Sequence, residues 1–283
     1  MTALLLAINY GLMILVPIAL AVFIWRRTGA PWRFFLMGAV TFILSQVLHI
    51  PFNALVQRSG LLPATTATAG LIITALFLGL SSGFFEETAR YLTYRFWAKD
   101  ARSWSRGLML GAGHGGGEAI ILGILGAIST FSLIAAANNE VAMNALPAEQ
   151  QQLITDALAQ IVNMPAPMLV LGAVERIFAI TCHLAMSLLV LQVFLRRNIV
   201  WLFLSIGFHA ALNMASVIAV SRVGPYWTEV IVGLFALLAV VIIFRLRGPE
   251  PTEPEPAPLP PPVDADALTL QPSDDALDRS RYH

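Results

Sequence analysis

Two adjacent glutamates and an arginine stand inside an apolar stretch of the chain. Glu86, Glu87 and Arg90 lie in a run of apolar residues that begins near Thr68. A charge inside membrane hydrocarbon costs about 2.5–3.5 kcal/mol even on lenient insertion scales, so such charges indicate a functional site. On a helix Arg90 can reach Glu86, four residues away, or Glu87, three residues away. One carboxylate held by Arg90 would leave the other as a general base for water. We favour Glu87 slightly as this base, and a structural ion pair between two helices is the alternative.

Charged and polar residues also interrupt three later apolar segments. They are His114 and Glu118 in the first of these, Glu175, Arg176 and His183 in the second, and His209 and Asn213 in the third. If the helices rise about 1.5 Å per residue, Glu87, Glu118, His183 and His209 all lie ~15–18 Å from the predicted cytoplasmic ends. That depth is near the midplane of a ~30 Å hydrocarbon core. Histidine, carboxylate and water are the ligands of catalytic zinc sites with an open position. The sequence therefore predicts that these side chains converge on one polar site.

Each of these residues also has a structural interpretation. A lone intramembrane histidine is more often a hydrogen-bonded packing residue, and we place His49 in that class. His114, flanked by glycines, could bind a metal directly or support a ligand. The adjacent Glu175 and Arg176 compensate each other, which favours a structural or substrate-contacting pair over a catalytic one. Asn213 could orient a ligand or an oxyanion, or simply join two helices. The shared depth of the group favours the functional interpretation.

The composition indicates that these residues lie in a membrane protein. The chain has 283 residues, of which 57% are hydrophobic and 12% charged, and its mean hydropathy is +0.74. A soluble domain carries about twice that charged fraction. Cys182 is the single cysteine, which excludes an internal disulfide and a cysteine-rich metal site. Net charge is zero, because seventeen basic residues balance seventeen acidic ones. Eight of the acidic residues follow Gly248, which leaves the rest of the chain net basic, and no feature indicates nucleic-acid binding.

The elements that must position the site are apolar segments long enough to cross a bilayer, which needs about 20 residues each. The sequence predicts an all-α, polytopic bundle of about seven transmembrane helices within residues 1–247. Their expected ranges are Ala3–Trp25, Phe34–Leu55, Thr68–Trp97, Gly107–Ala137, Pro167–Leu195, Val200–Val220 and Trp227–Phe244. Five glycines between 111 and 117 predict a kink or close helix packing in the fourth segment. Residues 248–283 are predicted to be a disordered, acidic, proline-rich tail.

Basic residues are distributed unevenly between the loops. Most arginines and lysines follow the first, third, fifth and seventh segments, whereas the fourth loop, 138–165, has none. By the positive-inside bias, we expect a multi-pass protein of the cell membrane with its N-terminus outside and its C-terminus and tail in the cytoplasm. From Pro147 the fourth loop has apolar residues at helical spacing. We expect a short amphipathic helix there, lying on the outer membrane interface.

Four stretches of the chain resemble an intramembrane protease superfamily that includes CAAX prenyl endopeptidases, bacteriocin-processing proteins and PrsW-type proteases. Within it, the chain is most similar to the bacterial YhfC-type intramembrane metalloproteases. The stretches are Glu86–Arg90, Gly113–Ala119, Glu175–Ser187 and His209–Asn213. The CAAX branch has three residues between its second glutamate and its arginine, where this chain has only Thr88 and Ala89. This departure weighs against a prenylated-cysteine substrate.

The resemblance implies roles for most of the polar residues. Glu86 or Glu87 would activate water beside Arg90, and Asn213 would support the oxyanion. His114, Glu118, His183 and His209 would form or support a metal site, with zinc as the expected ion, or polarise the scissile carbonyl. The implied activity is hydrolysis of a peptide bond in a peptide or membrane-protein substrate at the bilayer.

Two other classes of function remain open. Chains of glutamate and histidine also form proton relays in transporters, but the sequence has no inverted repeat or matched pair of broken helices. A non-catalytic scaffold or immunity protein could use the same fold, although it would not need glutamates and histidines at one depth. We therefore favour the protease.

Overall fold

The structure, a computed structural model, describes residues 1–248 and residue 250. It confirms the all-α class, because the described residues contain no strand. Seven of their helices are long and apolar enough to cross a membrane. Except for Gly248 and Glu250, the predicted tail lies outside the described residues. The seven long helices are α1 (Thr2–Thr28), α2 (Trp32–Arg58), α3 (Thr68–Leu92), α4 (Trp104–Ala137), α7 (Leu171–Leu195), α8 (Val200–Arg222) and α9 (Pro225–Arg245).

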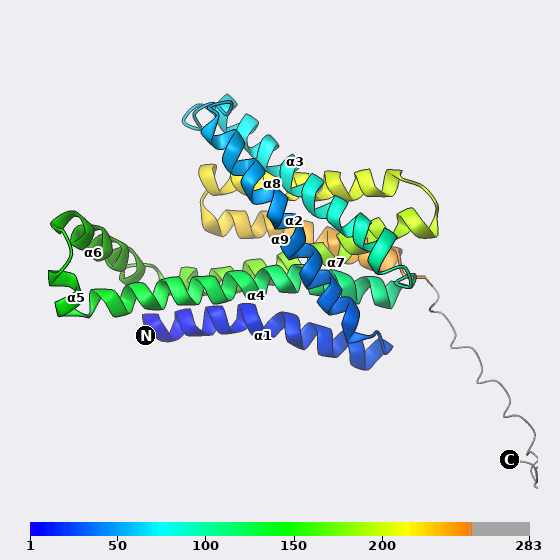
Figure 1. The fold of residues 1–283 in the computed structure, drawn as a ribbon, viewed down its shortest axis with the longest axis horizontal. Helices are drawn as coiled ribbons and strands as arrows, with labels where there is room; N and C mark the ends of the chain where they lie inside the picture. The colour runs from blue at the N-terminus through cyan, green and yellow to red at the C-terminus, as the bar shows by residue number, and fades with distance from the viewer. Residues whose placement is uncertain (249, 251–283) are drawn as a thin grey trace, which may run out of the picture. The chain divides into compact units, whose positions relative to one another are not determined.

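Two short irregular turns extend these helices, and two short helices lie outside the spans. A π-helical turn, Thr93–Trp97, continues α3, and a 3-10 turn, Ala166–Val170, precedes α7. In the fourth loop, α5 (Glu140–Asn144) is followed by α6 (Ala148–Val162). The helix predicted after Pro147 is therefore confirmed. It folds back along the far end of α4 (Figure 1), and its place on the membrane surface stays a prediction.

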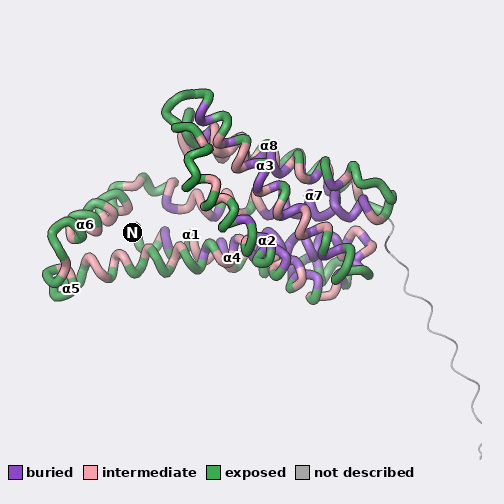
Figure 2. Tube along the Cα trace, turned by 45° about the horizontal axis from the view of Figure 1, so that its top comes forward, coloured by how far each residue is buried: buried purple, intermediate pink, exposed green. Residues whose placement is uncertain are grey.

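Helix α7 lies at the centre of the bundle. In the most apolar 18-residue stretch of this span, 72% of the residues are buried. In the corresponding stretches of the other six long helices, at most 39% are buried. It packs against α1, α4, α8 and α9, and Figure 2 shows buried residues concentrated along it. On the outside of this group, α2 crosses α4 diagonally, and α3 lies beside α2 and packs along α8 (Figure 1). His183 on α7 therefore lies where several helices pack together.

Glycines allow the helices around α4 to approach backbone to backbone. A Cβ added to Gly113 would lie 1.9 Å from the carbonyl oxygen of Phe35, and one added to Gly38 would lie 2.1 Å from that of Leu110. Gly115 faces the His183 side chain, where an added Cβ would come within 2.9 Å of its Cβ. Small residues permit such contact between membrane helices. The close packing predicted for the glycine-rich segment is confirmed, and it carries His114 into the interior.

Candidate active site

Close packing of α3 on α8 brings Glu87 to a histidine and a serine. A Cβ added to Gly79 would lie 2.5 Å from a backbone carbonyl oxygen of α8, so a larger residue would push the helices apart. His209 Nδ1 lies 2.9 Å from Glu87, and Ser205 Oγ donates to Glu87 at 2.6 Å. Arg90 donates to both oxygens of the same carboxylate, and neither side chain is exposed. Glu87 is therefore enclosed and held on all sides.

These contacts decide the tautomer of His209. The carboxylate of Glu87, paired with Arg90, can only accept hydrogen bonds, so the Nδ1 of His209 carries the proton it donates. In the neutral ring, Nε2 is then the free nitrogen, and it lies 4.0 Å from Glu86 Oε2. That distance is too long for a direct hydrogen bond. It is short enough for the two atoms to share one water.

Glu86 has different surroundings from its neighbour. Gln46 Nε2 donates to its Oε1 at 3.1 Å, and His114 Nε2 lies 3.2 Å from its Oε2. Glu86 also lines a small cavity that Glu87 does not reach. Successive helical residues point about 100° apart, because a turn holds 3.6 residues. The two adjacent glutamates are therefore available for two different tasks.

His183 connects this group to a second set of charges. Arg90 Nη2 donates to His183 Nδ1 at 3.1 Å, so that nitrogen is unprotonated, since a guanidinium cannot accept. Nε2 therefore carries the proton and donates to Glu118 at 2.9 Å. Glu118 also accepts from Arg176 at 2.7 Å. Arg176 in turn pairs with Glu175, which confirms the predicted ion pair between these two adjacent residues.

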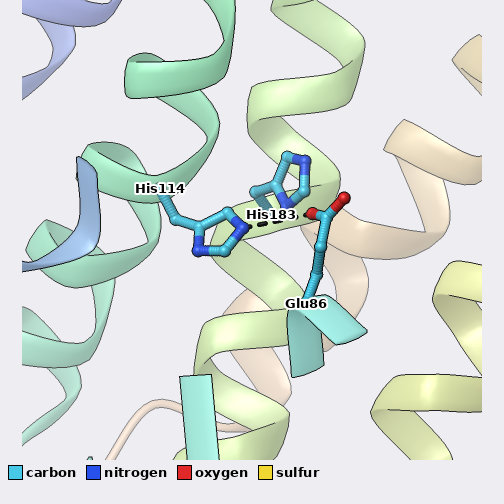
Figure 3. Close-up of side chains that lie close together, drawn as sticks. All are labelled: Glu86, His114 and His183. Atoms are coloured by element: carbon cyan, nitrogen blue, oxygen red, sulfur yellow. Dashed lines mark hydrogen bonds and ion pairs between the residues drawn. The ribbon is translucent and has the colours of Figure 1, made fainter. Parts of the chain in front are cut away.

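Three of these side chains could hold a metal ion. Glu86, His114 and His183 come from α3, α4 and α7, and Figure 3 shows them pointing toward one another. One ligand atom from each lies within 4.8 Å of the others, and all three residues are buried. A tetrahedral zinc ion with bonds of ~2.0–2.1 Å separates its ligands by about 3.3 Å, close to the 3.2 Å between His114 Nε2 and Glu86 Oε2. Two histidines and a glutamate also match the ligand types of a catalytic zinc site. To bind the ion, His183 would exchange one of its two present contacts, with Arg90 or with Glu118, for the metal.

The cavity beside this group has a volume of about 80 Å³. A single water needs roughly 10–15 Å³ measured in this way, so the cavity can hold several. Glu86, Glu118, His183, His209 and Asn213 all line it. Two members of the candidate metal group, Glu86 and His183, thus share one small polar space with the His209 imidazole and the Asn213 amide.

The structure brings the predicted residues into one cluster, with one difference in helix arrangement. Hydrogen bonds join five of them, Glu87, Arg90, Glu118, His183 and His209, into one set. A second set joins Glu86 to His114, and Asn213 lines the same cavity as Glu86 and His209. The rings of His183 and His209 are 5.5 Å apart. The fourth, fifth and sixth predicted segments, which correspond to α4, α7 and α8, are not all neighbours of one another. Within the described residues, α4 and α8 both pack on α7 and scarcely touch each other.

The three residues that could hold a metal ion also differ from the ligand set predicted from the sequence. His114 and His183 belong to both, but the third member is Glu86. Glu118 is instead bonded to His183 and Arg176, and the Nδ1 of His209 is bonded to Glu87. His49 lies outside the group, as expected, although it contacts Gln46, which bonds to Glu86.

Sequence reasoning missed two polar neighbours of the glutamates. Gln46 and Ser205 hydrogen-bond to Glu86 and Glu87 respectively. Both had a signal in the sequence. Gln46 lies three residues before His49, and Ser205 lies four residues before His209, so each shares a helix face with a polar residue already under consideration.

Comparisons with known proteins agree on one family. The family model described as YhfC intramembrane metalloprotease matches residues 12–236. The chain is also 33% identical over 250 residues to a Bacillus subtilis (strain 168) protein described as uncharacterized membrane protein YhfC. This match covers 86% of the present chain and 95% of that relative. No solved structure matches.

Proposed function

The chain belongs to the YhfC intramembrane metalloprotease family, and from that premise we propose that it hydrolyses a peptide bond in a membrane-associated substrate. The chain is a multi-pass membrane protein, and its helices contact the lipid bilayer. The observation that carries the proposal is the free Nε2 of His209, which lies 4.0 Å from Glu86 at a cavity that can hold several waters and that His183 also lines.

Glu86, His114 and His183 would hold the metal ion, and zinc is the ion we expect for two histidines and a glutamate. When bound, the metal would supply Lewis acidity that polarises a carbonyl and acidifies water. This assignment makes Glu86 a ligand and leaves Glu87 outside the reacting atoms. It therefore replaces the sequence-based preference for Glu87 as the base.

His209 acts as the general base in this proposal. Its Nε2 takes a proton from the water that it shares with Glu86, and can later return the proton to the leaving amine. Glu87 fixes the tautomer by accepting from Nδ1, and it stabilises the ring when the ring becomes positively charged. Arg90 and Ser205 hold Glu87 in place. Glu87 is thus a positioning residue.

Asn213 lies one helical turn beyond His209 on α8 and lines the same cavity. Its side-chain amide has two N–H donors. We assign it to the oxyanion that forms when water adds to the carbonyl, where one such donor is worth about 10²–10³-fold in rate. His209 and Asn213 would then act from one helix on the same peptide bond.

A His209→Gln variant tests the proposed base. Purified protein in lipid vesicles would be incubated with a library of apolar membrane peptides, and new termini would be identified by mass spectrometry. The variant should lose about 10²–10⁴-fold in cleavage rate, the range typical for general-base catalysis. His49→Gln, which alters another buried histidine, should cause a much smaller loss. Equal rates for wild type and His209→Gln would refute the assignment.

We also propose the orientation in which the N-terminus is outside and the C-terminus is cytoplasmic, as the distribution of basic residues between the loops indicates. Single cysteines at Gln151 and Ser273 in a Cys182→Ser background test it, with a thiol reagent that cannot cross the membrane. In intact cells, position 151 should react and position 273 should not. The reverse labelling pattern would refute the orientation.

A further inference from the structure

A second carboxylate region lies next to the site, between α7, α8 and α9. A vestibule of about 340 Å³ is lined there by residues that include Glu175, Ser216, Glu229 and Val232. Glu175, Ser216 and Val232 also line the small cavity of the candidate active site. The vestibule and the site cavity therefore adjoin each other.

The vestibule also adjoins an apolar groove along α7 and α9. This groove has a volume of about 630 Å³ and is lined almost entirely by apolar side chains, including Ile177 and Leu234. Leu234 is 60% exposed, as expected for a side chain that faces lipid in a membrane-spanning helix. Glu229 lines both the groove and the vestibule. The lipid-facing groove, the vestibule at Glu229 and the cavity lined by His183 and His209 thus follow one another, each sharing lining residues with the next.

Within the part of the chain that the structure describes, the Glu229 side chain forms no ion pair, unlike the other acidic groups beside these cavities. Arg176 donates to Glu118 and Glu175. Among the described residues, no group forms a hydrogen bond with the buried Oε2 of Glu229. A carboxylate in an apolar span is costly, and a cation from a ligand would offset that cost.

We propose that the peptide substrate reaches the site laterally, with an apolar segment in the α7–α9 groove and a basic residue beside Glu229. The apolar lining selects the segment, and the unpartnered carboxylate selects lysine or arginine where the peptide turns toward the site. This proposal rests on the proposed peptidase function, since it names the substrate class of that same site. Glu229 is a specificity residue here, because it lies outside the cavity where the reacting atoms meet.

Photo-cross-linking tests the route without requiring cleavage. A benzoylphenylalanine would replace Leu234 in the groove or, as a matched control, Leu15 on α1, since the two leucines are 60% and 61% exposed. The probes are three synthetic leucine–alanine peptides of about 20 residues, which end in Lys, Gln or Glu. Both wild type and His209→Gln would be reconstituted in lipid vesicles, so that cleavage cannot hide a cross-link.

The Lys peptide should cross-link to position 234 about fivefold more than the Gln or Glu peptide, and more than to position 15. Glu229→Gln should remove the advantage of the Lys peptide, and Glu229→Lys should transfer it to the Glu peptide. Equal yields for the three peptides in the otherwise wild-type protein would overturn the proposal without any variant at 229. Equal yields at positions 234 and 15, or a Lys preference that survives Glu229→Gln, would also overturn it.

The two proposals fail separately. If peptides are cleaved but do not cross-link preferentially at position 234, the lateral route is wrong and the peptidase stands. If the Lys peptide cross-links as expected but no peptide is cleaved by wild type, the groove is supported as a peptide-binding site and the peptidase is refuted.

Discussion

Two arginine-centred clusters meet at His183, and they differ mainly in burial. In the inner cluster Arg90 holds Glu87, and neither side chain is exposed. In the outer cluster Arg176 holds Glu118 and Glu175, and these three side chains are 12%, 21% and 43% exposed respectively. His183 accepts from Arg90 of the inner cluster and donates to Glu118 of the outer one. Arginine–carboxylate pairs thus lie on both sides of His183, fully buried on one side and partly exposed on the other.

The difference in burial decides which charged side chains can exchange their partners. A buried ion pair has no water to replace a lost partner, so its members are fixed in position. A partly exposed pair exchanges its partners with water at little cost. The inner cluster is therefore suited to fixing the His209 ring, whereas the outer cluster is suited to meeting a substrate at the vestibule.

The largest expected effect is on stability when each arginine is replaced. Arg90→Gln leaves Glu87 buried without its cation and should lower the free energy of unfolding by about 3–5 kcal/mol. Arg176→Gln should cost less, because its partners Glu118 and Glu175 line cavities large enough to hold water. Unfolding curves in a mixed-micelle denaturant titration measure both. Equal losses would remove the distinction between the two clusters.

A pair of serines on α8 gives an intermediate effect. Ser205 donates to the buried carboxylate of Glu87, whereas Ser216 donates to a carbonyl oxygen of its own helix. Ser205→Ala should cost about 1.5–3 kcal/mol, the range for a hydrogen bond to a charged group. Ser216→Ala should be close to neutral in the same titration. A larger loss for Ser216→Ala would contradict this account of the inner cluster.

The smallest effect is expected at the exposed edge of the outer cluster. Glu175→Gln removes a charge whose side chain is 43% exposed. It should change the free energy of unfolding by less than about 1 kcal/mol, as most exposed ion pairs do. Adding salt should weaken the contribution of Glu175 further. A salt-independent loss of several kcal/mol would show that the outer cluster is as dry as the inner one.

The sequence predicted the spans and the residues of the cluster better than their contacts. Hydropathy and length locate seven spans, because lipid requires about 20 apolar residues for each. Counting residues along each helix places Glu118, His183 and His209 at one level, and the structure brings them together. Residue types and helix depth were therefore enough to identify the cluster.

Contacts between helices were not predictable in the same way. Glu86 and Glu87 are neighbours in sequence, but Gln46 on α2 meets one, and Ser205 and His209 on α8 meet the other. Which helix faces which side depends on packing through glycines such as Gly79, whose partners no local pattern reveals. Glu229 was missed for a similar reason, since only the cavities place it near the site.

The proposed metal site is tested by the metal content of purified variants. The account predicts that wild type binds a metal ion, that Glu86→Gln and His114→Gln lose it, and that His209→Gln retains it, because only the first two alter the group formed with His183. Plasma emission spectrometry, with elution volume as the check on folding, gives the ratio of metal to protein. The account is contradicted if His209→Gln loses the metal while folded Glu86→Gln keeps it.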